Sequence, residues 1–255
     1  MMNKKIMLIN PIHTSEYDKD FIYQLNKYKN NETKVKVVSF QDNVGPTHLE
    51  YNCYESVVIP KLLKTVKKAE EDGYDAAIIG CFYDPALRAC REIVENMVIT
   101  APAESAMHIA TTLGDNFSII VGRRKWIPEM SDNVLKYGFD KKLASFKPLG
   151  LGVHDFQTNP EVTKQKIREA ATKAIEKDLA DSIILGCTVE FGFFADLQAD
   201  LGIPVIDASL APFKYAEFLI DLKNKLNWSH CKKIGYESPP KEGRKVFRTK
   251  LFKNG

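Results

Sequence analysis

Two cysteines stand in matching positions, each as the second residue of a Gly-Cys pair that follows a short apolar run. The first segment, DAAIIGCFYDPALRACREI, contains Cys81, and the second, DSIILGCTVEFGFFADL, contains Cys187. An aspartate stands six positions before each cysteine, namely Asp75 and Asp181. One Gly-Cys pair would be a weak signal, but the repeated spacing indicates two equivalent thiols at the ends of two equivalent strands.

A thiol at the point where a strand gives way to a helix is suited to acid/base chemistry. The amino end of a helix carries unpaired N–H groups and partial positive charge, which stabilise a thiolate. Asp84 and Pro85 after the first cysteine, and Thr188 and Glu190 after the second, are typical of helix starts. We therefore expect each cysteine to lie at the amino end of the helix that follows it.

Two such thiols on opposite sides of one carbon would invert its configuration. A thiolate removes the proton from one face, and a neutral thiol returns a proton to the other face of the planar intermediate. The carbon must be made acidic by a neighbouring carbonyl, and N–H donors at the helix starts would bind the enolate oxygen. This chemistry requires no pyridoxal and no metal, so we expect no cofactor.

The elements that must position these thiols alternate along the chain. Short β-branched runs separate longer segments with helical spacing, as in parallel βα units. The predicted strands are approximately Lys4–Asn10, Lys34–Phe40, Asp75–Gly80, Met97–Thr100, Asn116–Val121, Leu143–Leu149, Asp181–Leu185 and Pro204–Ile206. The predicted helices include Asp18–Tyr28, Ser56–Asp72 and Glu161–Leu179. The second half repeats the order of the first, which indicates a duplicated unit.

This order predicts an α/β fold of two pseudo-symmetric Rossmann-like lobes, each a roughly four-stranded parallel sheet flanked by helices. We expect residues 1–100 with about 208–255 to form the first lobe and residues 101–207 the second. Ligands of parallel sheets bind at the carboxyl ends of the strands. If the lobes face each other, Cys81 and Cys187 meet across an active site in the cleft between them.

Composition narrows the class of protein. The chain has 255 residues, 44% of them hydrophobic, and a net charge of +3 from 36 basic and 33 acidic residues. This even balance predicts a small-molecule substrate, with no nucleic acid and no membrane as partner, and it allows a homo-oligomer. The basic segment Lys241–Gly255 reads as a solvated tail. With no export signal and no long apolar run, we expect a cytoplasmic protein.

The remaining cysteines give no sign of a disulfide framework or a zinc site. Cys53, Cys90 and Cys231 form no CxxC pair with each other or with the Gly-Cys cysteines, and no histidines stand at zinc-ligand spacing. Single cysteines are most often small buried core residues, and we expect this of all three.

Several short segments resemble the Asp/Glu/hydantoin racemase superfamily, and hydantoin racemases in particular. The segment GCFYDPALRACRE at Gly80–Glu92 resembles the ACFGDPGLxAxRE segment of those enzymes. The resemblance spans roughly residues 5–240. Other similar segments follow in the family's order: INP at Ile9–Pro11, GP at Gly45–Pro46, APAESA at Ala101–Ala106, FSIIV at Phe117–Val121, LGC at Leu185–Cys187 and GIPVIDA at Gly202–Ala208.

The resemblance implies a cofactor-independent racemase or epimerase of the two-cysteine type. Cys81 and Cys187 would then be the two acid/base thiols. Asn10 matches the first asparagine of the family's NPN motif and would polarise the substrate. Phe82 and Thr188, each directly after a cysteine, would offer backbone N–H groups to a carbonyl or carboxylate oxygen.

Some residues depart from the hydantoin racemase pattern. Ile12 replaces the second asparagine of NPN, Tyr83 replaces a glycine, and GCTVE stands in place of GCAGM. Glu190 is thus an added carboxylate that would bind an ammonium or ureido N–H, or else serve as a helix-start acid. Arg123 follows the strand FSIIV and would clamp an anionic group, or else is a solvated loop arginine.

The sequence leaves several functions open. The first is racemisation of a 5-substituted hydantoin, allantoin or an amino acid. A cis–trans isomerase or decarboxylase of the same superfamily, acting on a small dicarboxylate, is a second; the arylmalonate decarboxylase type keeps only one of the two cysteines, which disfavours it here. A third is a non-catalytic protein that binds a small molecule, with the cysteines as packing residues.

Overall fold

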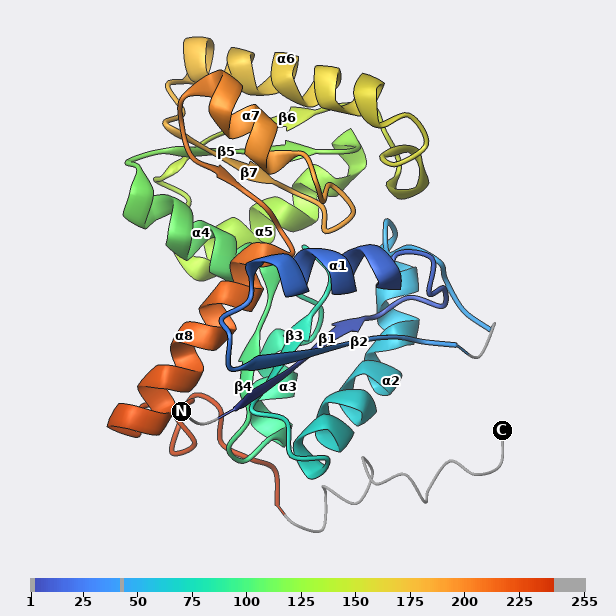
Figure 1. Ribbon diagram of the computed structural model, residues 1–255, viewed down its shortest axis with the longest axis vertical. Helices are drawn as coiled ribbons and strands as arrows, with labels where there is room; N and C mark the ends of the chain where they lie inside the picture. The colour runs from blue at the N-terminus through green and yellow to red at the C-terminus, as the bar shows by residue number, and fades with distance from the viewer. Residues whose placement is uncertain (1–2, 42–43, 241–255) are drawn as a thin grey trace. The chain divides into compact units, whose positions relative to one another are not determined.

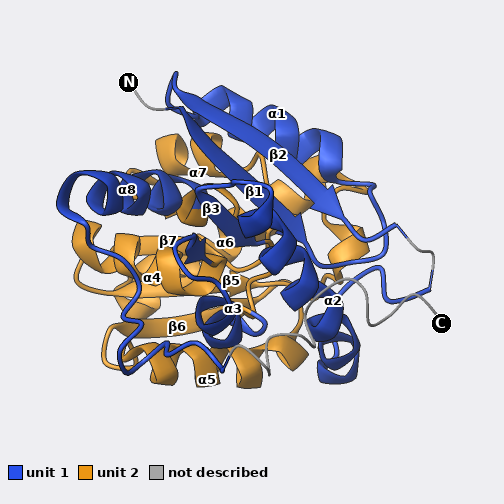
Figure 2. Ribbon diagram, turned by 90° about the horizontal axis from the view of Figure 1, so that it is seen from below, with its two compact units in different colours: residues 1–79, 85–100, 213–255 blue, residues 80–84, 101–212 orange. Residues whose placement is uncertain are grey.

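The computed structural model describes residues 3–41 and 44–240 (Figure 1). The chain divides into two compact units (Figure 2). Unit 1 comprises residues 1–79, 85–100 and 213–255, and unit 2 comprises residues 80–84 and 101–212. The short segment that carries Cys81 therefore belongs with unit 2, although the strand before it belongs to unit 1. The boundaries at about residues 100 and 208 that the sequence predicts for independent lobes stay a prediction.

Unit 1 is built on a four-stranded sheet in which every neighbouring pair is parallel. The strand order is β2-β1-β3-β4. Its strands are β1 (Lys4–Asn10), β2 (Thr33–Ser39), β3 (Ala76–Ile79) and β4 (Val98–Thr100), and its helices are α1 (Asp18–Tyr28), α2 (Asn52–Glu71), α3 (Leu87–Ile93) and most of α8 (Leu210–Leu226). All four residues of β3 are fully buried, as a strand covered on both faces requires.

Unit 2 repeats this plan with the strand order β6-β5-β7-β8, again parallel throughout. Figure 1 shows α6 and α7 on one side of the strands and α4 and α5 on the other. The strands are β5 (Phe117–Val121), β6 (Leu143–Pro148), β7 (Ser182–Leu185) and β8 (Val205–Ile206), and the helices are α4 (Pro102–Leu113), α5 (Ile127–Tyr137), α6 (Pro160–Asp178) and α7 (Phe194–Leu201). The predicted fold class, two four-stranded parallel sheets flanked by helices, is confirmed.

The repeated aspartate that precedes each Gly-Cys pair has the same task in both units. Asp75 accepts a hydrogen bond from the backbone N–H of Lys5, at the start of β1. Asp181 accepts hydrogen bonds from the N–H groups of Asp115 and Asn116, just before β5. Each carboxylate ties the beginning of the central strand to the strand that ends in Gly-Cys. The duplication thus extends from the strand order to individual hydrogen bonds.

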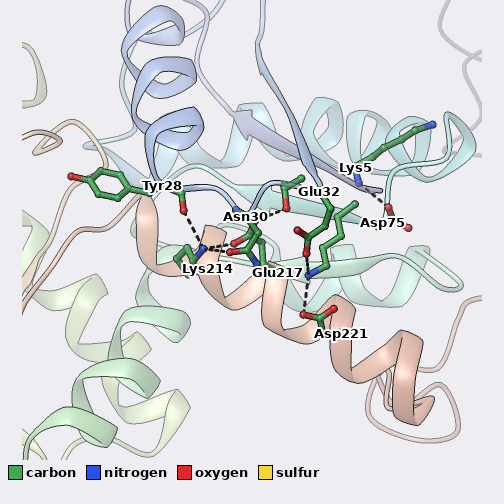
Figure 3. A network of polar contacts seen from close by, with 10 residues as sticks. Lys5, Tyr28, Asn30, Glu32, Asp75, Lys214, Glu217 and Asp221 are labelled. Carbon is green, nitrogen blue, oxygen red and sulfur yellow. Dashed lines mark hydrogen bonds and ion pairs between the residues drawn. The ribbon is translucent and has the colours of Figure 1, made fainter. Parts of the chain in front are cut away.

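Helix α8 is held on unit 1 by buried polar groups (Figure 3). Lys4 is 4% exposed, and its ammonium group lies 2.8 Å from Asp221 and 3.3 Å from Glu32. Glu217 is 2% exposed and accepts a hydrogen bond of 2.5 Å from the Thr33 hydroxyl. Because a buried charge without a partner is costly, these pairings fix the position of α8 along the sheet.

The three further cysteines divide between the core and the surface. Cys90 on α3 is fully buried, and burial raises the pKa of its thiol to about 12. Cys53 and Cys231 are exposed, so the expectation that they are core residues is wrong. Cys53 lies near the start of α2, and Cys231 lies in the segment after α8. All five cysteines are free thiols.

The expected solvated tail, Lys241–Gly255, lies outside the described residues. Within the part of the chain that the structure describes, no helix is both long enough and apolar enough to cross a membrane.

Candidate active site

Both cysteines follow strands that flank the point where a sheet changes its winding direction. In the order β2-β1-β3-β4, the chain moves outward in one direction from β1 to β2 and in the other from β3 to β4. The connections on the two sides of such a point leave a crevice beyond the carboxyl ends of the central strands. In the first sheet these ends are Asn10 on β1 and Ile79 on β3, directly before Gly80, and in the second they are Val121 on β5 and Leu185 on β7, directly before Gly186.

The two cysteines occupy turns of the same shape. The N–H of Asp84 donates to the carbonyl oxygen of Cys81 at 3.0 Å, and the N–H of Glu190 donates to the carbonyl oxygen of Cys187, also at 3.0 Å. Each turn therefore closes on an acid three residues after the cysteine. Both cysteines are partly exposed, as residues that meet a dissolved substrate must be.

The helices begin later than the sequence predicts. Helix α3 starts at Leu87 and α7 at Phe194, so neither cysteine lies in the first turn of a helix. The backbone explains the delay in the first turn, because Asp84 and Ala86 have φ angles of 52° and 53°, in the left-handed region that a right-handed helix excludes. The expectation that the amino ends of these two helices stabilise the thiolates is therefore wrong.

The two Gly-Cys turns lie against each other within unit 2. The Thr188 hydroxyl, directly after Cys187, donates a hydrogen bond of 3.3 Å to the carbonyl oxygen of Gly80, directly before Cys81. Gly186 allows its own turn to pack closely, because a Cβ atom there would stand 2.5 Å from the carbonyl oxygen of Ile120. The structure thus brings together two segments that lie more than a hundred residues apart in the chain.

The first turn is anchored by the Asp84 side chain. Its carboxylate accepts hydrogen bonds from the N–H groups of Ala103 at 2.8 Å and Glu104 at 2.9 Å, which are orphan donors at the start of α4. The Tyr137 hydroxyl donates a third, also at 2.9 Å. Burial raises the pKa of Asp84 to about 7 even though these three donors act to lower it. Asp84 therefore joins the Cys81 turn to two helices of unit 2.

The second turn is anchored differently. The Glu190 side chain, 1% exposed, turns back so that Oε2 accepts the N–H of Cys187 at 3.1 Å, while Oε1 is buried without a hydrogen-bond partner. Burial raises the pKa of Glu190 well above its ordinary value, and the nearby Asp207 raises it further. Glu190 stands before the first residue of α7, so the alternative that it is an acid in the first turn of that helix is wrong.

The other predicted site residues lie at strand ends. Asn10 is buried in unit 1 and donates to the Ser39 hydroxyl at 3.1 Å. Phe82 is 3% exposed and Thr188 6%, both within the turns. Arg123 is half-buried and lines a basic depression of unit 2 together with Arg124, Lys125, Gly150, Gly152 and Asp155. Among the described residues, no group of three or more His, Cys, Asp or Glu side chains could hold a metal ion.

Sequence reasoning missed the residues that hold the first turn in place. Tyr137 reaches Asp84, and the Asn133 side-chain amide donates to the carbonyl oxygen of Tyr83 at 2.7 Å. Both come from α5, about fifty residues later in the chain. The sequence contains one sign that these turns are anchored: an acid stands three positions after each cysteine, Asp84 after Cys81 and Glu190 after Cys187.

Comparison with known proteins gives consistent matches over most of the chain. The family model described as Asp/Glu/Hydantoin racemase matches residues 6–216. A hydantoin racemase of Pseudomonas sp. (strain NS671) is 34% identical over 221 residues, covering 87% of this chain and 88% of that protein. A hydantoin racemase of Paenarthrobacter aurescens is 30% identical over 236 residues, covering 92% and 97%.

A solved structure agrees with these relatives. The allantoin racemase from Klebsiella pneumoniae superposes with a TM-score of 0.86 at 26% sequence identity. The match covers 93% of this chain and 94% of that one.

Proposed function

The chain belongs to the Asp/Glu/hydantoin racemase family, and on that premise we propose that this racemase inverts a carbon next to a carbonyl in a hydantoin or allantoin, using Cys81 and Cys187 as its two acid/base groups. The observation that carries the proposal is the pair of matched, partly exposed cysteine turns joined by the bond from Thr188 to Gly80. The named activities of the relatives support the choice of substrate.

The proposed reaction is a proton exchange through an enolate. One cysteine, as thiolate, takes the proton from the substrate carbon and becomes a thiol, and the electron pair of the broken C–H bond moves to the carbonyl oxygen. The other cysteine, as thiol, gives its proton to the opposite face and becomes a thiolate. Backbone N–H groups of Phe82 and Thr188 would stabilise the enolate oxygen, and Asn10 would polarise the carbonyl.

An uncharged ring suits this site better than a free amino acid. An amino acid needs an ionised partner for its ammonium group, and the acids of the two turns, Asp84 and Glu190, are buried at 2% and 1% exposure. Burial raises the pKa of both, which disfavours the charged form that an ammonium would require. Buried aromatic side chains in the first turn, Phe82 and Tyr83, fit a ring or an apolar substituent.

The remaining expectations stay predictions. That Arg123 clamps an anionic group of the substrate from the end of β5 stays a prediction. That Glu190 binds an ammonium or ureido N–H of the substrate also stays a prediction, and its 1% exposure argues against direct contact. A cytoplasmic location suits a reaction that needs reduced thiols, since disulfides seldom form in that compartment. Assembly into a homo-oligomer is a further prediction.

The test is proton NMR in deuterium oxide, which follows loss of the signal from the hydrogen on the reacting carbon. The panel contains 5-substituted hydantoins, allantoin, aspartate and glutamate. We expect exchange and racemisation of the cyclic ureides, and loss of net inversion in Cys81→Ser and in Cys187→Ser. Cys53→Ser, which changes an exposed cysteine on α2, is the matched control.

Two results would contradict the proposal. If either active-site variant racemises as fast as the parent, the two-thiol mechanism is wrong. If only aspartate or glutamate exchanges, the substrate class is wrong while the mechanism stands.

A further inference from the structure

The two acids that close the cysteine turns occupy equivalent positions but are used differently. Asp84 closes the first turn and spends its carboxylate on the start of α4, the helix that follows β4. The equivalent helix in the second repeat is α8, which follows β8. Its start is already capped by Asp207, whose Oδ1 accepts from the N–H of Ser209 at 2.8 Å, the Ser209 hydroxyl at 2.6 Å and the N–H of Leu210 at 3.0 Å.

Glu190 consequently does not bind the start of a helix, as Asp84 does. It bonds instead to Cys187 from both sides: its N–H donates to the Cys187 carbonyl, and its Oε2 accepts the Cys187 N–H. Its other oxygen, Oε1, has no hydrogen-bond partner and no contact with solvent. A buried acceptor without a donor costs free energy, so stability alone does not account for this side chain.

The surroundings of Glu190 favour its neutral form. The groups that act on its carboxyl are the backbone N–H groups of Gly186 and Cys187, from the turn after β7, and the carboxylate of Asp207, from the start of α8. Asp207 accepts three hydrogen bonds at the start of α8, which stabilise its carboxylate form. Burial raises the pKa of Glu190, and a second negative charge beside Asp207 raises it further, so the neutral form of Glu190 is favoured.

We propose that Glu190 is the positioning residue of Cys187: as a neutral carboxylic acid it holds the Cys187 turn from the inside, and when it ionises it suppresses the Cys187 thiolate. The proposal rests on the proposed function in giving Cys187 an acid/base role. Because Cys187 must exist alternately as thiol and thiolate, a permanent charge three residues away would favour the thiol and slow one direction of proton transfer. A neutral acid supplies the same hydrogen-bond acceptor without that charge.

The experiment measures the reactivity of each thiol, which requires no turnover. Parent and Glu190→Gln are treated with iodoacetamide from about pH 6 to about pH 10, and mass spectrometry gives the alkylation rate at each cysteine. Gln keeps an acceptor for the Cys187 N–H and cannot ionise. We expect equal Cys187 rates at the acid end and, once Glu190 ionises in the parent, a Cys187 rate about tenfold lower than in Glu190→Gln.

Cys81 in the same samples is the internal control, and its rates should be alike in the two proteins at every pH. Equal Cys187 rates across the whole range would overturn the coupling. If Cys187 already reacts more slowly in the parent than in Glu190→Gln at the lowest pH, Glu190 is ionised throughout. That result would overturn the proposal that it acts as a neutral acid.

If Glu190→Gln does not fold, the parent alone decides. Its Cys187 rate–pH curve should be broader than the titration of one group, and a curve that fits a single titrating group would contradict the proposal. If Cys187 reactivity depends on Glu190 but the protein racemises nothing in the substrate panel, the proposed function is wrong and this inference stands.

Discussion

Replacing Asp84 by Asn tests how burial and hydrogen bonding compete at the first cysteine turn. The carboxyl is 2% exposed, and its three donors come from Ala103, Glu104 and Tyr137. Burial dominates and raises the pKa to about 7 from an ordinary value of 3.8. Asn has one acceptor oxygen where Asp has two, so in the variant the side-chain NH2 group faces a donor that a carboxylate oxygen accepts in the parent. The Asn side chain also does not titrate.

The direction of the pH effect follows from proton binding. Because the folded pKa is above the unfolded one, the folded state binds more protons between these two values. The stabilisation is fully present below about pH 3.8 and is lost as the pH rises through about 7. Between about pH 5 and about pH 8, the parent should lose about 2.5 kcal/mol of unfolding free energy through Asp84. Asp84→Asn should lose none through this position.

The assay is urea unfolding followed by circular dichroism, for parent and variant, at both pH values. All other titrating groups are common to the two proteins, so the difference between them isolates Asp84. Asp84→Asn should have a lower free energy of unfolding than the parent at the lower pH, and this difference should become smaller as the pH rises. A gap that is the same at both pH values, or wider at the higher one, would refute the reasoning: the three donors would then outweigh burial and keep the carboxylate ionised throughout.

Three further substitutions test other contacts. Gly186→Ala should destabilise the fold by about 2 kcal/mol in chemical unfolding, since its Cβ would meet the Ile120 carbonyl oxygen, whereas Gly235→Ala, with no atom within 4 Å, should be neutral. Glu217→Ala should cost about 3 kcal/mol, because it strands the Asn30 N–H and the Thr33 hydroxyl, and a cost near zero would show that water replaces the carboxylate. Thr188→Val, which removes the bond to Gly80, should lower kcat/KM roughly fivefold at a cost of only about 1 kcal/mol in stability, and an unchanged kcat/KM would mean that this bond does not align the turns.

Local patterns were sufficient for the elements that lead to the cysteines. The ranges predicted for β1 and α1 agree with the structure at both ends, and the predicted Asp75–Gly80 contains β3 (Ala76–Ile79). Apolar periodicity identifies such elements because neighbouring residues of a strand or helix share one environment. The start of α2 was placed four residues late, at Ser56 instead of Asn52. Helix ends depend on which groups satisfy their free N–H donors, and no capping side chain marks this one.

The sequence by itself determined the duplicated α/β plan, the two Gly-Cys strand ends and the acid that follows each cysteine, because these depend on residue types repeated at fixed spacing. Only the tertiary structure decided what the two acids do. Asp84 reaches α4 and Tyr137, while Glu190 turns back on Cys187 because Asp207 already caps α8. Such choices depend on strand register and helix packing across a hundred residues of chain, where the nearest donor in space is distant in sequence.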